Sequence, residues 1–125
     1  MPYKLTIDDA NAIILVRVYG ATTHEEHQAA RKETAQICRN KEYRRLLVDL
    51  RDLETEHVVS TKTCFEFAMS YQQSGLPDGL RIAHLMPHSP SAHENVDFIT
   101  TIAKHRSALI QNFDDLDEAK KWLLE

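Results

Sequence analysis

Two histidines and two glutamates stand together in the stretch GATTHEEHQAAR, residues 20 to 31, directly after an apolar run that is typical of a strand. Both residue types are common zinc ligands, so this stretch is the first candidate for metal chemistry. Zinc hydrolases of the HExxH type place their histidines four residues apart on one face of a helix. Here His24 and His27 are three residues apart, and the sequence supplies no convincing third ligand nearby. We therefore expect no zinc hydrolase site.

The same stretch fits the start of a helix better. Thr23, followed three residues later by Glu26, forms a capping box: the hydroxyl accepts from the Glu26 amide, and the glutamate reaches back to the Thr23 amide. The pattern recurs after two later expected strands, at Ser91 with Glu94 and, in acidic form, at Asp115 with Glu118. One structural explanation covers all three places.

Other catalytic motifs are missing from the sequence. A nucleophile elbow would read GxSxG, and a phosphate loop would be rich in glycine and end in Lys-Ser or Lys-Thr. The chain has only three glycines and contains neither motif. Its acidic runs, DLRDLETE and DDLDE, fall at strand ends and helix starts, where turns and caps use acids. We expect a protein that is not an enzyme and that holds no cofactor.

Five of the seven histidines follow expected strands, where open parallel sheets bind ligands. They are His24, His27, His57, His88 and His93. A metal-binding or pH-sensitive rim is therefore one hypothesis, with His57, His88 and His93 as its candidate metal ligands. Solvated surface histidines are the ordinary alternative, and the expectation is that no metal is bound.

The elements that must position any site alternate along the chain. Period-two and apolar runs predict strands at 3–7, 12–19, 45–50, 80–86 and 107–113, and helical patterns predict helices at 24–40, 60–74, 91–105 and from 115. An N-terminal hairpin is followed by a strict order of helix and strand, which implies right-handed crossovers. We expect one α/β domain over residues 1–125, with a five-stranded, mainly parallel sheet, an antiparallel first strand and four helices.

The second expected helix is apolar over too wide an arc. Its apolar residues span roughly 200°, about twice what a helix lying on a sheet needs. They are Cys64, Phe65, Phe67, Ala68, Met69 and Tyr71. Part of this surface should face something other than the sheet. It is covered either by a neighbouring helix or loop, with Val58 and Val59 as candidates, or by a partner protein or a second copy of the chain.

Composition excludes several classes of partner. The formal net charge is −4 and the basic residues are interspersed with acids, so we expect no binding to nucleic acid. The longest apolar run, residues 12 to 16, is far shorter than the ~20 residues of a membrane span, and the N-terminus lacks the apolar stretch of a signal peptide. Cys38 and Cys64 fall inside expected helices and are predicted to be buried, reduced thiols. We expect a cytoplasmic protein.

Three segments resemble a known family. RRLLVDLRDL, LRIAHLMP and above all NFDDLDEAKKWL are similar to the SpoIIAA-like branch of the STAS superfamily, named for sulfate transporters and anti-sigma factor antagonists. The resemblance covers nearly the whole chain. It implies a superhelix of strand and helix turns that is shared with CRAL-TRIO lipid-transfer domains. It also implies a non-enzymatic domain that binds protein partners and sometimes nucleotides.

The resemblance also implies a phosphorylation site. In the anti-sigma factor antagonists a serine at the start of the second helix, in a DSSG-like motif, is phosphorylated. The nearest candidates here are Ser60 and Thr61, after the strand that ends at Asp49. They depart from the motif, because Val59 replaces the preceding aspartate and Lys62 the following glycine.

Three hypotheses of function follow. The leading one is a regulatory module that binds a protein partner, or a second copy in a homo-oligomer, through the second helix and the loop before it. The residues of that surface are Val58, Val59, Ser60, Thr61, Phe65 and Met69. The alternatives are a carrier of a small apolar or lipid ligand, as the CRAL-TRIO relationship implies, and a metal-binding protein that uses the histidine rim.

Overall fold

The structure is a computed structural model that describes residues 3–21, 24–54, 60–73, 75–106 and 108–125. Within these residues five strands form one sheet in the order β1-β2-β3-β4-β5. The strands are β1 (Tyr3–Asp8), β2 (Ile13–Val18), β3 (Arg45–Asp49), β4 (Arg81–Leu85) and β5 (Leu109–Phe113). β1 pairs with β2 in antiparallel fashion, and β2 to β5 run parallel. The predicted hairpin and mainly parallel sheet are confirmed.

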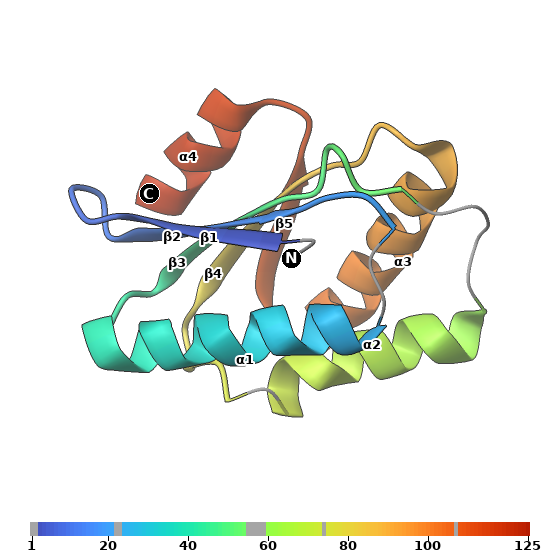
Figure 1. Ribbon diagram of the computed structural model, residues 1–125, viewed down its shortest axis with the longest axis horizontal. Helices are drawn as coiled ribbons and strands as arrows, with labels where there is room; N and C mark the ends of the chain where they lie inside the picture. The colour runs from blue at the N-terminus through green and yellow to red at the C-terminus, as the bar shows by residue number, and fades with distance from the viewer. Residues whose placement is uncertain (1–2, 22–23, 55–59, 74, 107) are drawn as a thin grey trace.

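Four helices connect or follow the parallel strands of the described chain. They are α1 (His24–Lys41), α2 (Thr61–Gln73), α3 (Pro90–His105) and α4 (Leu116–Leu124). Figure 1 shows α4 on one side of the sheet and α1, α2 and α3 on the other. The sheet is therefore the middle layer, and its strands are covered on both faces, as expected of parallel strands rich in valine, isoleucine and leucine.

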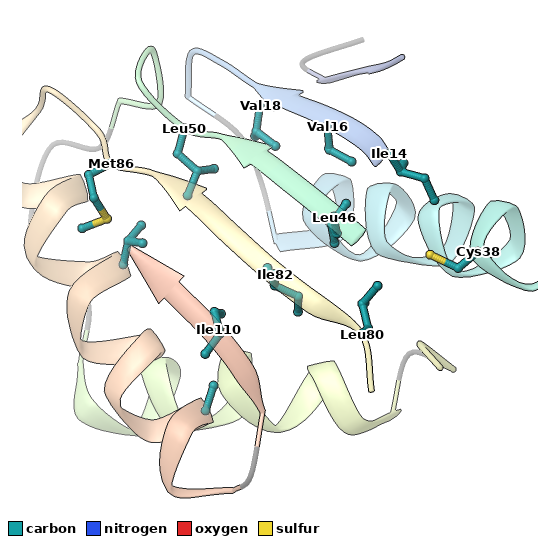
Figure 2. Packing of buried hydrophobic residues seen from close by; sticks show 12 residues of the cluster. Ile14, Val16, Val18, Cys38, Leu46, Leu50, Leu80, Ile82, Met86 and Ile110 are labelled. Carbon is teal, nitrogen blue, oxygen red and sulfur yellow. The ribbon is translucent and has the colours of Figure 1, made fainter. Parts of the chain in front are cut away.

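Alternation along β2 separates two buried clusters. Ile14, Val16 and Val18 point to the layer of α1, α2 and α3, where Cys38 of α1 joins them (Figure 2). Ile13 points to the opposite face, where it belongs to the cluster that contains residues of α4. A shift of register by one residue would exchange the two faces, so this apolar pattern fixes how β2 pairs with its neighbours.

The second helix lies on another helix and not mainly on the sheet. α2 packs against α3, and Cys64 and Ala68 are the buried side chains on its described part. The extra apolar arc predicted for this helix is thus partly explained by a neighbour within the same chain.

The helix starts confirm one of the three predicted caps. Asp115 Oδ2 accepts a hydrogen bond from the Glu118 amide at 3.0 Å, as predicted. The prediction for Ser91 is wrong, because α3 begins at Pro90 and its N-cap is Ser89, which accepts from the Ala92 amide at 3.5 Å. Proline fits the first helical position since its missing N–H would have no partner there. The third cap, at residue 23, lies outside the described residues.

Both cysteines are free and buried, Cys38 in α1 and Cys64 in α2, as predicted. Burial raises the pKa of both thiols, so they are protonated and unreactive at neutral pH. Over the described part of the chain, every helix is too short or too polar to cross a bilayer.

Candidate functional site

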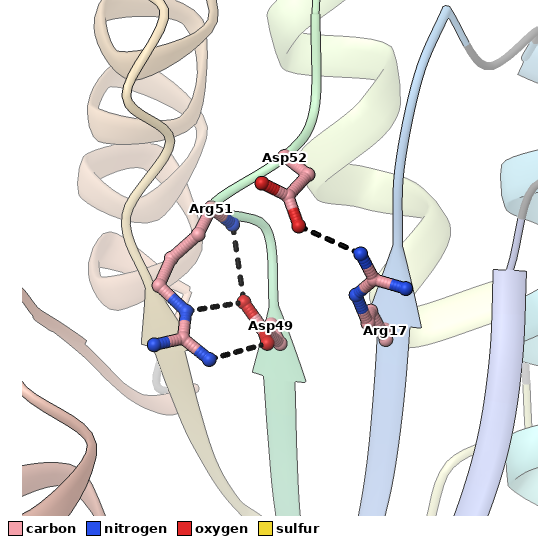
Figure 3. A network of polar contacts seen from close by, with 4 residues as sticks. All are labelled: Arg17, Asp49, Arg51 and Asp52. Carbon is pink, nitrogen blue, oxygen red and sulfur yellow. Dashed lines mark hydrogen bonds and ion pairs between the residues drawn. The ribbon is translucent and has the colours of Figure 1, made fainter.

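Polar side chains gather where β2 and β3 end, at the carboxyl edge of the sheet. Asp49, the last residue of β3, is held by Arg51 through two side-chain hydrogen bonds, Nε to Oδ1 at 3.0 Å and Nη2 to Oδ2 at 2.9 Å (Figure 3). The Arg51 amide adds a third at 3.1 Å. Burial opposes ionisation of Asp49, but the hydrogen bonds from Arg51 outweigh it and lower the pKa of the carboxyl. This carboxylate is therefore ionised at neutral pH and is held by Arg51 as a structural partner.

A second ion pair ties the segment after β3 to β2. Arg17 Nη2 lies 2.7 Å from Asp52 Oδ2, as Figure 3 shows, and the guanidinium also lies 4.8 Å from the centre of the Tyr19 ring. The Gly20 amide donates to the Asp52 carbonyl, and the Glu54 amide donates to the Gly20 carbonyl. Gly20 adopts a positive φ of 69°. These contacts fix the direction in which the chain leaves β3 toward α2.

Ser60 is the residue that starts α2. Its Oγ accepts from the Thr63 amide at 3.2 Å and lies 2.9 Å from Thr63 Oγ1, while its carbonyl accepts the first helical hydrogen bond from Cys64. This is the geometry of an N-cap, which satisfies amides that have no partner inside the helix. Ser60 and Thr61 are both exposed. The two predicted phosphate acceptors therefore lie at a helix N-terminus, where the helix dipole favours negative charge.

The exposed aromatic residue of the described part of α2 is Phe65. Its side chain is 42% exposed, and the Arg106 guanidinium at the end of α3 lies 5.0 Å from the centre of its ring. Met69, one turn further along, is half-buried. Val58 and Val59 lie outside the described residues, as do the side chains of the other two aromatic residues of α2. The structure thus places Phe65, Met69, Ser60 and Thr61 on one helix.

The histidine rim does not form a metal site in the part of the chain that the structure describes. His88 and His93 are exposed, and no group of three metal-ligating side chains occurs among the described residues. His57 and the side chain of His24 lie outside them. The backbone of His88 joins the segments that follow β3 and β4, because its amide donates a hydrogen bond to the Arg51 carbonyl.

A buried polar cluster was not predicted from the sequence. His84, the fourth residue of β4, is 2% exposed, and its Nδ1 lies 3.2 Å from Asn112 Oδ1 and 3.3 Å from Thr100 Oγ1. Burial lowers the pKa of His84 to about 4, so the ring is neutral at pH 7. The signal in the sequence is a single histidine inside the apolar run LRIAHLM, followed by an asparagine at the facing position of the next strand.

Comparison with known proteins identifies the fold. No family model matches the sequence, and no curated protein matches it. An anti-sigma factor antagonist from Mycobacterium paratuberculosis has a similar structure, with a TM-score of 0.61 and 15% sequence identity over 98% of this chain and 95% of that one. The protein TM1081 has a TM-score of 0.55 and 18% identity over 95% of this chain and 86% of that one. The chain therefore has the fold of the SpoIIAA-like STAS domains that its sequence resembles.

Proposed function

We propose that this chain is a non-enzymatic regulatory module that binds a protein partner through the α2 surface. We define that surface by Ser60, Thr61, Phe65 and Met69, together with Val58 and Val59, which precede the helix in the sequence and lie outside the described residues. The exposure of Phe65 carries the proposal, and the fold shared with an anti-sigma factor antagonist supports it.

The chemistry around Phe65 suits an interface. Cys64 and Ala68 anchor α2 from within, so the helix presents Phe65 on a fixed backbone. Arg106 covers one side of the ring, and aromatic and arginine side chains are the residue types that dominate binding energy at protein interfaces. A partner that removed this ring from water would gain apolar burial without the cost of first ordering the helix.

Phosphorylation of Ser60, or of its neighbour Thr61, is the proposed means of regulation. A phosphate at the N-cap would add about two negative charges where backbone amides and the helix dipole favour them. It would also place that charge within about one and a half helical turns of Phe65, on the proposed docking surface. We expect it to change partner binding without unfolding α2.

The two buried thiols support a reducing compartment, so the proposal places the module in the cytoplasm.

The partner is a different protein or a second copy of the chain. Light scattering at micromolar concentration separates the two. If wild type is a dimer and Phe65→Glu is a monomer, the partner is a second copy of the chain. If wild type and Phe65→Glu are both monomers, the partner is a different protein.

The test is capture of partners from native lysate by immobilised chain. Phe65→Glu is compared with wild type and with Leu109→Glu, a matched control because Leu109 on β5 is also an exposed large apolar residue, at 51%. We expect a protein that wild type and Leu109→Glu retain and that Phe65→Glu loses, with all three chains equally folded by circular dichroism. If Phe65→Glu retains the same proteins in the same amounts, α2 is not the docking surface.

A further inference from the structure

The first strand is an edge of the sheet whose outer side has no partner in the part of the chain that the structure describes. β1 stands at the end of the strand order and pairs with β2 on its inner side. No other described backbone group donates to it or accepts from it. Alternate N–H and C=O groups of β1 therefore face outward, where a strand of another chain can pair with them.

One face of β1 carries opposite charges near its two ends. Ile13 and Arg17 of β2 point to the α4 side of the sheet, and their register partners, Asp8 and Lys4, lie on the same face. Thr6 stands between these two. α4 packs on β3, β4 and β5, and both Lys4 and Thr6 are exposed. A second chain can therefore reach this face from the edge of the sheet.

Neither charge forms an ion pair with a described residue. Lys4 stands opposite Arg17 in the hairpin, and like charges in facing positions are unfavourable. Asp8 accepts hydrogen bonds from Asn11, from the backbone amide at 3.3 Å and from Nδ2 at 2.9 Å. The Asn11 side chain, with a smaller effect of the Lys120 charge, lowers the pKa of Asp8, so the carboxyl is ionised at pH 7. Both charges are left for a second chain to neutralise.

One register of strand pairing brings these charges together between two copies of the chain. When two β1 strands lie antiparallel with Thr6 opposite Thr6, Lys4 of each copy faces Asp8 of the other. On the opposite face, half-buried Leu5 then faces half-buried Ile7 of the other copy. Opposite charges, paired threonines and apolar pairs all stabilise facing strands. We propose that β1 pairs in this register with β1 of a second copy and joins the two chains in a two-fold dimer.

The charges select this register over its neighbours. A pair centred on Leu5 would place Lys4 opposite Thr6, and a pair centred on Ile7 would place Asp8 opposite Thr6. Neither arrangement neutralises a charge. A lysine on an edge strand commonly prevents pairing with other strands. Here Asp8 of the other copy removes that obstacle for one partner in one register, so Lys4 still discourages other strands.

The assembly closes at two copies. Because both copies contribute the same edge, no β1 edge remains for a third chain, and the two five-stranded sheets become one continuous sheet. β5, the other edge strand, contains no charged residue and cannot select a partner in this way.

This dimer does not use the α2 surface, since α2 packs on α3 and α1 is the helix that contacts β1. Phe65→Glu should therefore self-associate as strongly as wild type. Failure of the β1 proposal leaves docking on α2 standing, and failure of docking on α2 leaves the β1 proposal standing.

Analytical ultracentrifugation with exchanged charges tests the pairing and its register. We expect wild type to form dimers between micromolar and millimolar concentration. Lys4→Glu and Asp8→Lys should each raise the dissociation constant about tenfold, because the two-fold axis makes each substitution act twice. An equimolar mixture of the two variants should dimerise again, since each acid then faces a lysine. Lys104→Glu, which changes the charge of an exposed lysine on α3, is the matched control and should behave as wild type.

A cross-linking experiment tests the register without changing any charge. Thr6→Cys places a thiol on the proposed two-fold axis, so a short bismaleimide should link two copies. Gln111→Cys, also exposed but on the β5 edge, is the control for random collisions and should not be linked.

A wild-type chain that stays monomeric up to millimolar concentration would overturn the proposal. Lys4→Glu that dimerises as wild type does would also overturn it, and this variant removes no contact between described residues. Folded Lys4→Glu and Asp8→Lys that stay monomeric when mixed, or Thr6→Cys linked no faster than Gln111→Cys, would rule out the proposed register.

Discussion

Acid should destabilise this protein through His84, and the size of the effect follows from its burial. The ring has its ordinary pKa of 6.5 in the unfolded chain and a pKa of about 4 in the folded one. Between these values the unfolded state binds a proton that the folded state does not bind. Stability from this group is therefore complete above pH 6.5, falls as the pH drops through 6.5, and levels off below about 4.

The expected loss is about 3 kcal/mol between pH 7 and pH 4, since each unit of pKa difference corresponds to about 1.4 kcal/mol. The assay is urea unfolding at both pH values for wild type and for His84→Leu. Leucine cannot titrate, and the Thr100 hydroxyl still bonds to Asn112 in its presence. Carboxylates contribute equally to both proteins, so the comparison isolates the imidazole.

We expect the free energy of unfolding of His84→Leu to fall by about 3 kcal/mol less than that of wild type between the two pH values. This difference is independent of any cost that the substitution carries at pH 7. Equal losses in the two proteins would refute the reasoning, because they would mean that the folded state accepts the proton on His84 as readily as the unfolded state does.

Three further experiments test the contacts that hold the edge of the sheet and its helices. Arg51→Ala leaves the half-buried Asp49 carboxylate without its guanidinium partner, so we expect the free energy of unfolding in urea to fall by about 1 kcal/mol. Arg17→Ala, at the exposed pair with Asp52, should lower it by less. The reverse order would contradict this account. Ser60→Ala removes the N-cap of α2 and should cost about 1 kcal/mol, which Ser60→Asp restores; faster amide exchange confined to the first turn of α2 is the check. Arg45→Met removes the bond to the last turn of α4, so hydrogen exchange should rise in α4 and stay unchanged in α3.

The strands could be predicted because their signal is local. Alternation in β1 and the apolar runs of β2 and β4 reflect burial on one or both faces of the sheet, and neighbouring residues alone reveal it. The cap at Asp115 is equally local. The cap of α3 was misplaced because Ser89 and Ser91 both suit an N-cap, and the choice depends on Pro90, which prefers the first helical position.

Contacts between distant segments could not be predicted in this way. The packing of α2 on α3 depends on how two crossovers share one face of the sheet, so an apolar arc on α2 did not reveal what covers it. Arg106, which lies over Phe65, comes from a position 41 residues further along the chain. His84 and Asn112 meet through strand register and Thr100 joins them from a helix, so the cluster exists only in the folded chain.

The central claim is that partners dock on the α2 surface. Once the captured protein is purified, a titration of ¹⁵N-labelled chain with it tests the claim most directly, because each backbone amide reports its own surroundings. We predict that the largest shifts occur at Ser60, Thr61, Phe65 and Met69 and extend to Arg106. Shifts concentrated instead on α4, with the amides of α2 unchanged, would contradict the account.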